Sequence, residues 1–145
     1  MAGYPGRSLT QKLGVKPHHR VALLGAPRGA RALLEPLPAG VRLNRKPTPE
    51  TDLALLFASS HAELRASFPV AMKQMSLDGT IWVAWPKRAS GVSTDLTGDR
   101  VRAFGLASGL VDVKVCAVDD VWSGLKFVRR LEDRRKLRDC VGMKG

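Results

Sequence analysis

Short apolar runs alternate along this chain with segments that carry signals for helices. Four of the runs are nearly unbroken, as is typical of parallel strands that are covered on both faces. They predict strands over Arg20–Leu24, Val41–Leu43, Asp52–Phe57 and Thr80–Trp85.

Helix start and stop signals lie before and between these runs. Ser8 and Gln11 have the spacing of a capping box, and with Gly14 they predict a short helix over Leu9–Leu13. The prolines after Leu34 leave room for only one or two turns within Arg28–Leu34. Two longer helices are predicted. The first follows Ser60, carries Leu64, Phe68, Met72 and Met75 on one face, and has a kink where Pro69 starts a second segment. The second runs from about Leu96 to Ser108 and is capped by Gly109.

Two more apolar runs, Val111–Val118 and Leu125–Leu131, close the pattern. The turn between them is too short for a helical crossover, so these strands must be antiparallel. The chain is therefore predicted to be α/β: a single three-layer Rossmann-like domain whose mainly parallel sheet ends in an antiparallel β-hairpin. We assign residues 1–131 to this domain and residues 132–145 to a basic C-terminal tail.

The length of 145 residues and the apolar content of 44% suit one domain with its own core. No run is long and apolar enough to cross a bilayer and no secretory signal is evident, so we expect a cytoplasmic protein without membrane contact. Cys116 and Cys140 stand apart with no zinc-ligand spacing, and we expect no metal site.

The formal net charge of +11 attracts polyanions, and nucleic acid is the first partner to consider. Much of the excess lies in the first twenty residues and in the segment from Arg129 to Gly145. Charge by itself gives only non-specific attraction, so a solvated basic surface is favoured over a specific nucleic-acid site.

The candidate binding cleft follows from the fold, because ligands of open α/β sheets sit at the carboxyl ends of the strands. Arg28, Lys87 and Arg88 are placed to hold an anion there, with Ser90 and backbone N–H groups completing the site. Thr94 or Asp95 either caps the next helix or leaves its N-terminus open to a phosphate. The alternative is that Lys87 and Arg88 are solvated and that the polar residues only cap the helix. The predicted ligand-binding residues are Gly25, Arg28, Trp85, Lys87, Arg88, Ser90, Thr94 and Asp95.

Four segments resemble a family of small bacterial proteins of unknown function with a class I methyltransferase-like Rossmann fold: LGVKPHHRVALLGAP, LDGTIWVAWPK, TDLTGDRVRAFGLASGLVD and VCAVDDVWSGLKFVRRL. The resemblance implies the fold and supplies no activity. Methyltransferases bind S-adenosylmethionine on a glycine-rich turn after the first strand and hold its ribose with an acid after the second. Here Pro27 interrupts the turn, and the second strand ends in Leu43-Asn44-Arg45, without an acid.

Three functions remain open. The first is a non-catalytic or cryptic module that binds an anionic small molecule or a protein partner in the cleft, with no cofactor expected. The second is a methyltransferase that still binds S-adenosylmethionine despite its aberrant loop. The third is a nucleic-acid-associated protein that uses its basic ends, although the basic-aromatic alternation of single-strand binders is missing.

Overall fold

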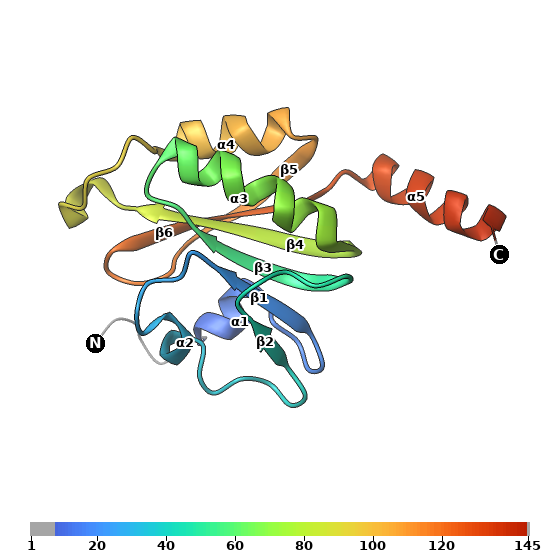
Figure 1. Cartoon of the computed structure of the whole chain (residues 1–145), viewed down its shortest axis with the longest axis horizontal. Helices are drawn as coiled ribbons and strands as arrows, with labels where there is room; N and C mark the ends of the chain where they lie inside the picture. The colour runs from blue at the N-terminus through green and yellow to red at the C-terminus, as the bar shows by residue number, and fades with distance from the viewer. Residues whose placement is uncertain (1–7, 145) are drawn as a thin grey trace.

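One mixed sheet organises the chain, whose computed structural model describes residues 8–144, with side chains up to residue 139. Within these residues six strands lie in the order β2-β1-β3-β4-β6-β5 (Figure 1). The first four in this order are parallel, and β6 and β5 are antiparallel. The predicted Rossmann-like class is thereby confirmed. The strands are β1 (Arg20–Leu24), β2 (Arg42–Asn44), β3 (Thr51–Phe57), β4 (Met75–Pro86), β5 (Leu110–Ala117) and β6 (Trp122–Arg129).

Helices lie on both faces of the sheet and give the three layers. One core lies under α3 and α4 and contains the side of the sheet that carries Ile81, Val83 and Phe127. The other lies toward α1 and α2, around Trp82 and Leu55. Successive residues of β4 thus enter opposite cores, as strand alternation requires. The helices are α1 (Leu9–Leu13), α2 (Ala30–Leu33), α3 (His61–Gln74), α4 (Gly98–Ala107) and α5 (Leu131–Lys144), with one 3-10 turn, η1 (Arg88–Ser90).

Helix α1 forms as its local signals predict. The Ser8 side chain accepts the Gln11 N–H, and the Gln11 side chain accepts the Ser8 N–H in return. Gly14 ends the helix with φ 87°, a left-handed conformation that glycine adopts without a steric penalty. The helix is held on the sheet by the Trp82 indole, whose Nε1 donates to the Leu13 carbonyl at 2.8 Å.

Helix α3 departs from the prediction, because it runs through Pro69 as a single element and ends before Met75. Leu64, Phe68 and Ala71 lie on both sides of Pro69 and are buried in the same core. We attribute the continuity of the helix to this shared burial, with Pro69 itself on the exposed side. Met75 still enters the core, but as the first residue of β4.

Strand β6 begins at Trp122, three residues before its predicted start. Gly124, which we expected in the turn, pairs with Ala84 inside the sheet. A Cβ on Gly124 would lie 3.2 Å from the Trp82 ring and from the Val118 side chain. A side chain at residue 124 would therefore require Trp82 and Val118 to shift by a few tenths of an ångström.

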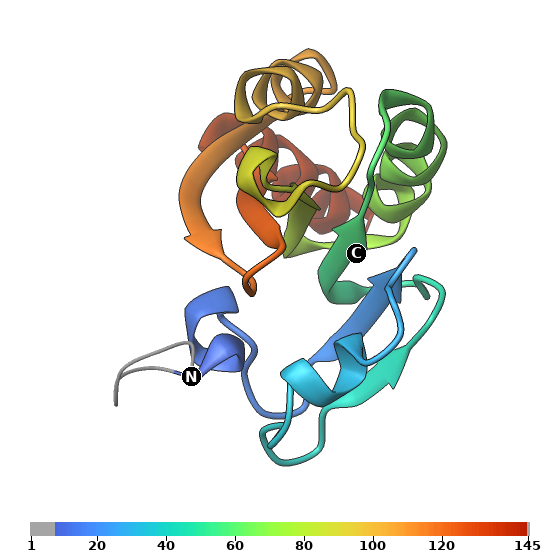
Figure 2. The same ribbon diagram turned by 90° about the vertical axis from the view of Figure 1, so that its left-hand side faces the viewer.

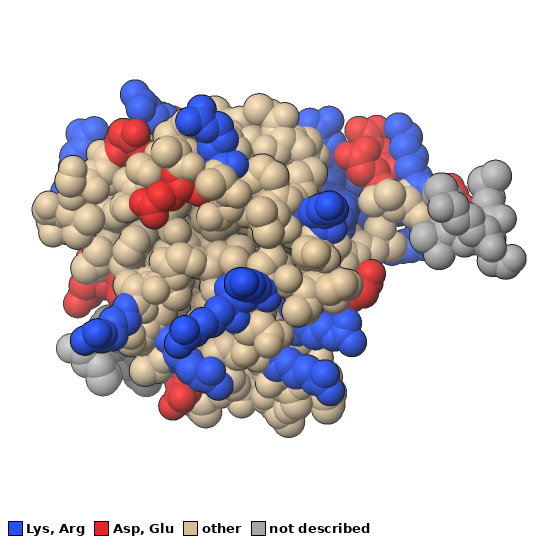
Figure 3. All heavy atoms as spheres, viewed as in Figure 1, with Lys and Arg blue, Asp and Glu red and all other residues tan. Residues whose placement is uncertain are grey.

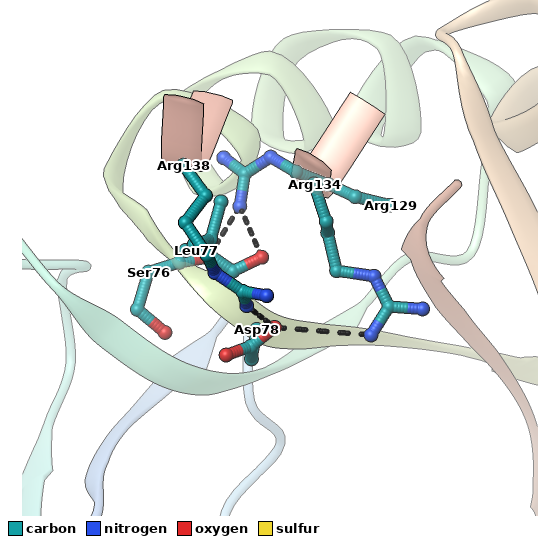
Figure 4. A network of polar contacts seen from close by, with 6 residues as sticks. All are labelled: Ser76, Leu77, Asp78, Arg129, Arg134 and Arg138. Atoms are coloured by element: carbon teal, nitrogen blue, oxygen red, sulfur yellow. Dashed lines mark hydrogen bonds and ion pairs between the residues drawn. The ribbon is translucent and has the colours of Figure 1, made fainter. Parts of the chain in front are cut away.

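Helix α5 extends from the end of the sheet, away from the other helices (Figure 1). Its base is fixed by Arg129, whose guanidinium donates to the carbonyls of Ser76 and Leu77 where β4 begins (Figure 4). The same guanidinium also donates to the Met75 carbonyl. Arg134 and Arg138 of α5 lie 3.8 and 3.5 Å from the Asp78 carboxylate. These contacts join α5 to the amino end of β4, opposite the edge predicted to bind a ligand.

Candidate functional site

The carboxyl edge of the parallel strands faces the viewer in Figure 2. Two hollows lie along this edge. The β1–β2 hollow has a volume of about 600 Å³ and is bounded by residues 25–31 and the ends of β1 and β2. The β4 hollow, of about 720 Å³, is bounded by the end of β4 and by residues 91–98. Both volumes are in the range of small-molecule sites.

Gly25 shapes the wall of the β1–β2 hollow. Its φ of +62° is left-handed, and a Cβ there would lie 2.7 Å from the Phe57 carbonyl oxygen. The loop that leaves β1 can therefore lie this close to the end of β3 only with glycine at residue 25. The chain then continues through Pro27 into the four-residue helix α2.

The β1–β2 hollow is strongly basic. Arg28, Arg31 and Arg45 line it together with Asn44, and its lining contains no acidic residue. Among the side chains that the structure describes, none of these arginines lies within ion-pair distance of a carboxylate. In the view of Figure 3, Lys and Arg side chains gather over the part of the molecule that contains β1 and β2. The hollow is therefore suited to an anionic group.

Lys87 and Ser90, both predicted to bind ligand, hold the loop after β4 in place. Lys87 Nζ donates to the Asp119 carbonyl at 2.8 Å and so joins this loop to the β5–β6 turn. Ser90 Oγ donates to the Lys87 carbonyl at 2.6 Å and accepts the Val92 N–H at 3.2 Å, within the turn η1. Neither residue is among those that line the β4 hollow.

The expected cap of α4 was placed too early, because neither Thr94 nor Asp95 caps this helix. The cap is Thr97, whose hydroxyl accepts the Arg100 N–H at 3.2 Å. Thr94 instead accepts the Leu96 N–H, and Asp95 accepts the His61 N–H of helix α3 at 2.8 Å. Thr94, Asp95 and Thr97 all line the β4 hollow, so these polar residues of its rim are already engaged in local structure.

Trp85 and Arg88 also line the β4 hollow. Trp85 is only 9% exposed and packs in the core under α3 and α4, where a Cβ on Gly98 would lie 3.4 Å from its ring. Its ring therefore forms part of the wall of the β4 hollow and is not free to stack on a ligand. Arg88 is exposed, and among the described side chains no carboxylate lies within ion-pair distance of it.

The eight predicted residues are thus not brought together in one site. Gly25 and Arg28 line the β1–β2 hollow, whereas Trp85, Arg88, Thr94 and Asp95 line the β4 hollow. Residues Arg31, Asn44 and Arg45 of the first hollow were missed as site residues. In the parallel pairing of β1 with β2, Asn44 lies opposite Ala22, so the end of β2 reaches the same edge of the sheet as the end of β1. The prediction that these two strands are parallel neighbours was the signal that could have identified Asn44 and Arg45.

The described residues contain neither a cluster of metal ligands nor a membrane-spanning helix. No group of three His, Cys, Asp or Glu side chains there lies close enough together to hold a metal ion. None of the described helices is long and apolar enough to cross a membrane.

The fold is similar to that of several methyltransferases of known structure. No protein-family model matches the sequence, and no curated protein matches it either. Among solved structures, a SAM-dependent methyltransferase from Aquifex aeolicus aligns with a TM-score of 0.61 and 10% identity over 84% of this chain and 88% of its own. The pyocyanin biosynthetic protein PhzM aligns at 0.60 and 11% over 85% and 53%, and the DhpI–SAH complex at 0.59 and 10% over 86% and 83%. At these identities the likeness concerns the fold.

Proposed function

We propose that this protein is a methyltransferase that binds S-adenosylmethionine in the β1–β2 hollow. The position of the hollow carries the proposal. It lies at the carboxyl end of β1, where the chain connects to β2 on one side of β1 and, further on, to β3 on the other. Ligands of open α/β sheets bind outside such a switch in strand order. The Aquifex structure is a SAM-dependent methyltransferase and the DhpI structure holds SAH, which supports the same cofactor here.

The lining residues fit the parts of this cofactor. Leu23, Pro27 and Leu43 offer apolar contacts for the adenine ring, and the Asn44 amide can donate to and accept from the ribose hydroxyls. Arg28 or Arg31 would pair with the methionine carboxylate. Gly25 leaves room because it has no Cβ to fill the wall of the hollow. When bound, the cofactor supplies an electrophilic methyl group on its sulfonium; the chain supplies position and charge.

Two departures from the methyltransferase pattern weaken cofactor binding without removing the site. Pro27 lacks the N–H that other residues would offer to the ligand. Asn44 stands where methyltransferases hold the ribose with a carboxylate, and hydrogen bonds to a neutral acceptor are the weaker kind. The arginines also repel the sulfonium charge. We therefore expect a modest affinity for S-adenosylmethionine.

The β4 hollow is the proposed space for the methyl acceptor. It lies at the end of β4, two strands from β1 along the same edge of the sheet. Its lining combines the Trp85 wall with Arg88 and the hydroxyl of Ser93. Such a mixed lining orients a ligand by a few polar contacts on an apolar surface.

A pair of charge reversals tests where the cofactor binds. Arg28→Glu changes an exposed residue of the β1–β2 hollow, and Arg88→Glu makes the same change at the β4 hollow. In thermal-shift titrations with S-adenosylmethionine we expect Arg28→Glu to lose most of the stabilisation and Arg88→Glu to keep it. Equal behaviour of the two variants, or no stabilisation of the parent protein, would overturn the assignment. Transfer of a labelled methyl group to small-molecule, RNA or protein acceptors then separates an enzyme from a module that only binds the cofactor.

A further inference from the structure

Four lysines meet on the α1 side of the β5–β6 hairpin, and none of them lines either hollow. We call them the lysine cluster: Lys12, Lys16, Lys114 and Lys126. Lys114 and Lys126 are direct cross-strand partners in the hairpin. Lys114 Nζ donates to the Lys12 carbonyl at 3.4 Å, and a Cβ on Gly14 would lie 3.9 Å from Lys126 Nζ. Figure 2 shows α1 directly below this hairpin.

The charges of the cluster act on one another. Partial burial lowers the pKa of Lys126, and the positive charges of Lys114 and Lys16 lower it further. The Cys116 thiol nearby experiences the fields of Lys12 and Lys114, which oppose the rise in its pKa caused by burial. Within residues 8–139 no carboxylate lies in ion-pair distance of any of the four ammonium groups. The cluster is therefore a concentration of uncompensated positive charge.

Such an arrangement costs stability in the free protein. Like charges directly opposite each other on paired strands are destabilising, and Lys126 also loses hydration. An acidic residue at position 114 or 126 would remove the cost by forming a cross-strand ion pair. An anionic ligand removes the same cost on binding, and each lysine is a point charge suited to phosphate.

We infer that the lysine cluster binds the phosphate backbone of a nucleic acid. Lys16 and Lys114 are exposed and Lys12 and Lys126 half-buried, so the four groups form an open face rather than an enclosed pocket. A small anion gains little enclosure on such a face, whereas a polymer places several phosphates on it at once. The net charge of +11 attracts such a polymer from a distance. The inference does not depend on cofactor binding.

Charge reversal at Lys114 gives opposite effects on binding and stability. We expect Lys114→Glu to weaken binding of a fluorescent single-stranded RNA and of a duplex DNA, measured by anisotropy, by roughly tenfold at low salt. The slope of log K against log salt should fall by about one to two units. The same variant should melt at a higher temperature than the parent protein, because the introduced carboxylate would pair with Lys126.

Lys73→Glu is the matched control. Lys73 lies exposed in the last turn of α3, on the other face of the sheet, and its reversal changes the net charge by the same amount. We expect it to keep most of the nucleic-acid binding. Equal losses of binding in the two variants would mean that bulk charge, and not this cluster, determines the affinity. Absence of binding at low salt would also overturn the inference. Displacement of the RNA by equimolar tripolyphosphate would overturn it as well. Titration of both variants with S-adenosylmethionine tests cofactor binding independently of nucleic-acid binding, since neither residue lines the β1–β2 hollow.

Discussion

Asp95 accepts a hydrogen bond from the backbone N–H of His61 at 2.8 Å, across 34 positions of sequence. His61 is the first residue of α3, so the carboxylate satisfies one of the unpaired N–H groups at that end and lies favourably in the helix dipole. The contact joins the loop after β4 to α3. The β4 hollow is therefore bounded by a loop that is fixed to the scaffold.

Removal of this contact should destabilise the protein. Asp95→Ala leaves the His61 N–H without its partner, and we expect a loss of about 1 kcal/mol in the free energy of unfolding. Asp95→Asn keeps an acceptor and should recover part of the loss. Urea denaturation of the three proteins measures both, and an unchanged midpoint for Asp95→Ala would contradict the assigned role.

The Trp82 indole is a second long-range anchor. It is fully buried and its Nε1 holds the carbonyl at the end of α1, so Trp82→Phe removes a donor and leaves a small cavity. We expect a loss of about 2 kcal/mol or more. Trp122→Phe, at a half-buried position whose ring contacts Phe57 edge-on, should cost less. Thermal unfolding compares them, and the reverse ranking would show that the indole N–H is unimportant.

Arg129 should control the attachment of α5. Arg129→Met leaves three carbonyls at the start of β4 without their donor, with an expected cost of about 1–3 kcal/mol. Hydrogen exchange in α5 should also accelerate, because its ion pairs to Asp78 lie next to this anchor. Arg130→Met changes the exposed neighbour and should leave exchange unchanged. Equal exchange in the two variants would refute the anchoring role.

Lys126 gives the protein a specific pH dependence. Its pKa is lowered from 10.5 in the folded state, so the folded protein binds fewer protons than the unfolded chain as pH approaches that value. The charged form of Lys126 lowers the free energy of unfolding, and this loss is fully present below the pKa that Lys126 has in the folded state. The loss disappears as pH rises toward 10.5. Relative to Lys126→Met, the parent protein should therefore gain stability over this alkaline range. Chemical denaturation at several pH values measures the difference, and a constant difference would contradict the lowered pKa.

Local signals in the sequence predicted much of the fold. The reciprocal cap of α1 needs only Ser8 and Gln11, and the buried strands β1 and β3 are nearly continuous apolar runs. The passage of α3 through Pro69 was not predictable in this way, because it depends on burial of residues on both sides of the proline against the sheet.

The candidate site was harder to predict than the fold. Strand order directed attention to the carboxyl edge, where Gly25 and Arg28 line the β1–β2 hollow. The sequence could not show that Lys87 donates to Asp119 or that Asp95 serves α3, since these partners lie 32 and 34 positions away. The sequence therefore indicated the ligand-binding chemistry of Lys87 and Asp95 but not their role in holding the loop after β4 in place.

Calorimetric titration of the parent protein and of Asn44→Asp with S-adenosylhomocysteine would decide whether the β1–β2 hollow binds the cofactor. The hydrolytically stable product has no sulfonium charge to oppose the arginines, and a carboxylate at position 44 restores the charged acceptor for the ribose. We expect saturable binding at one site that salt hardly affects, tightened several-fold by Asn44→Asp. Absence of heat at millimolar ligand in both proteins would contradict it.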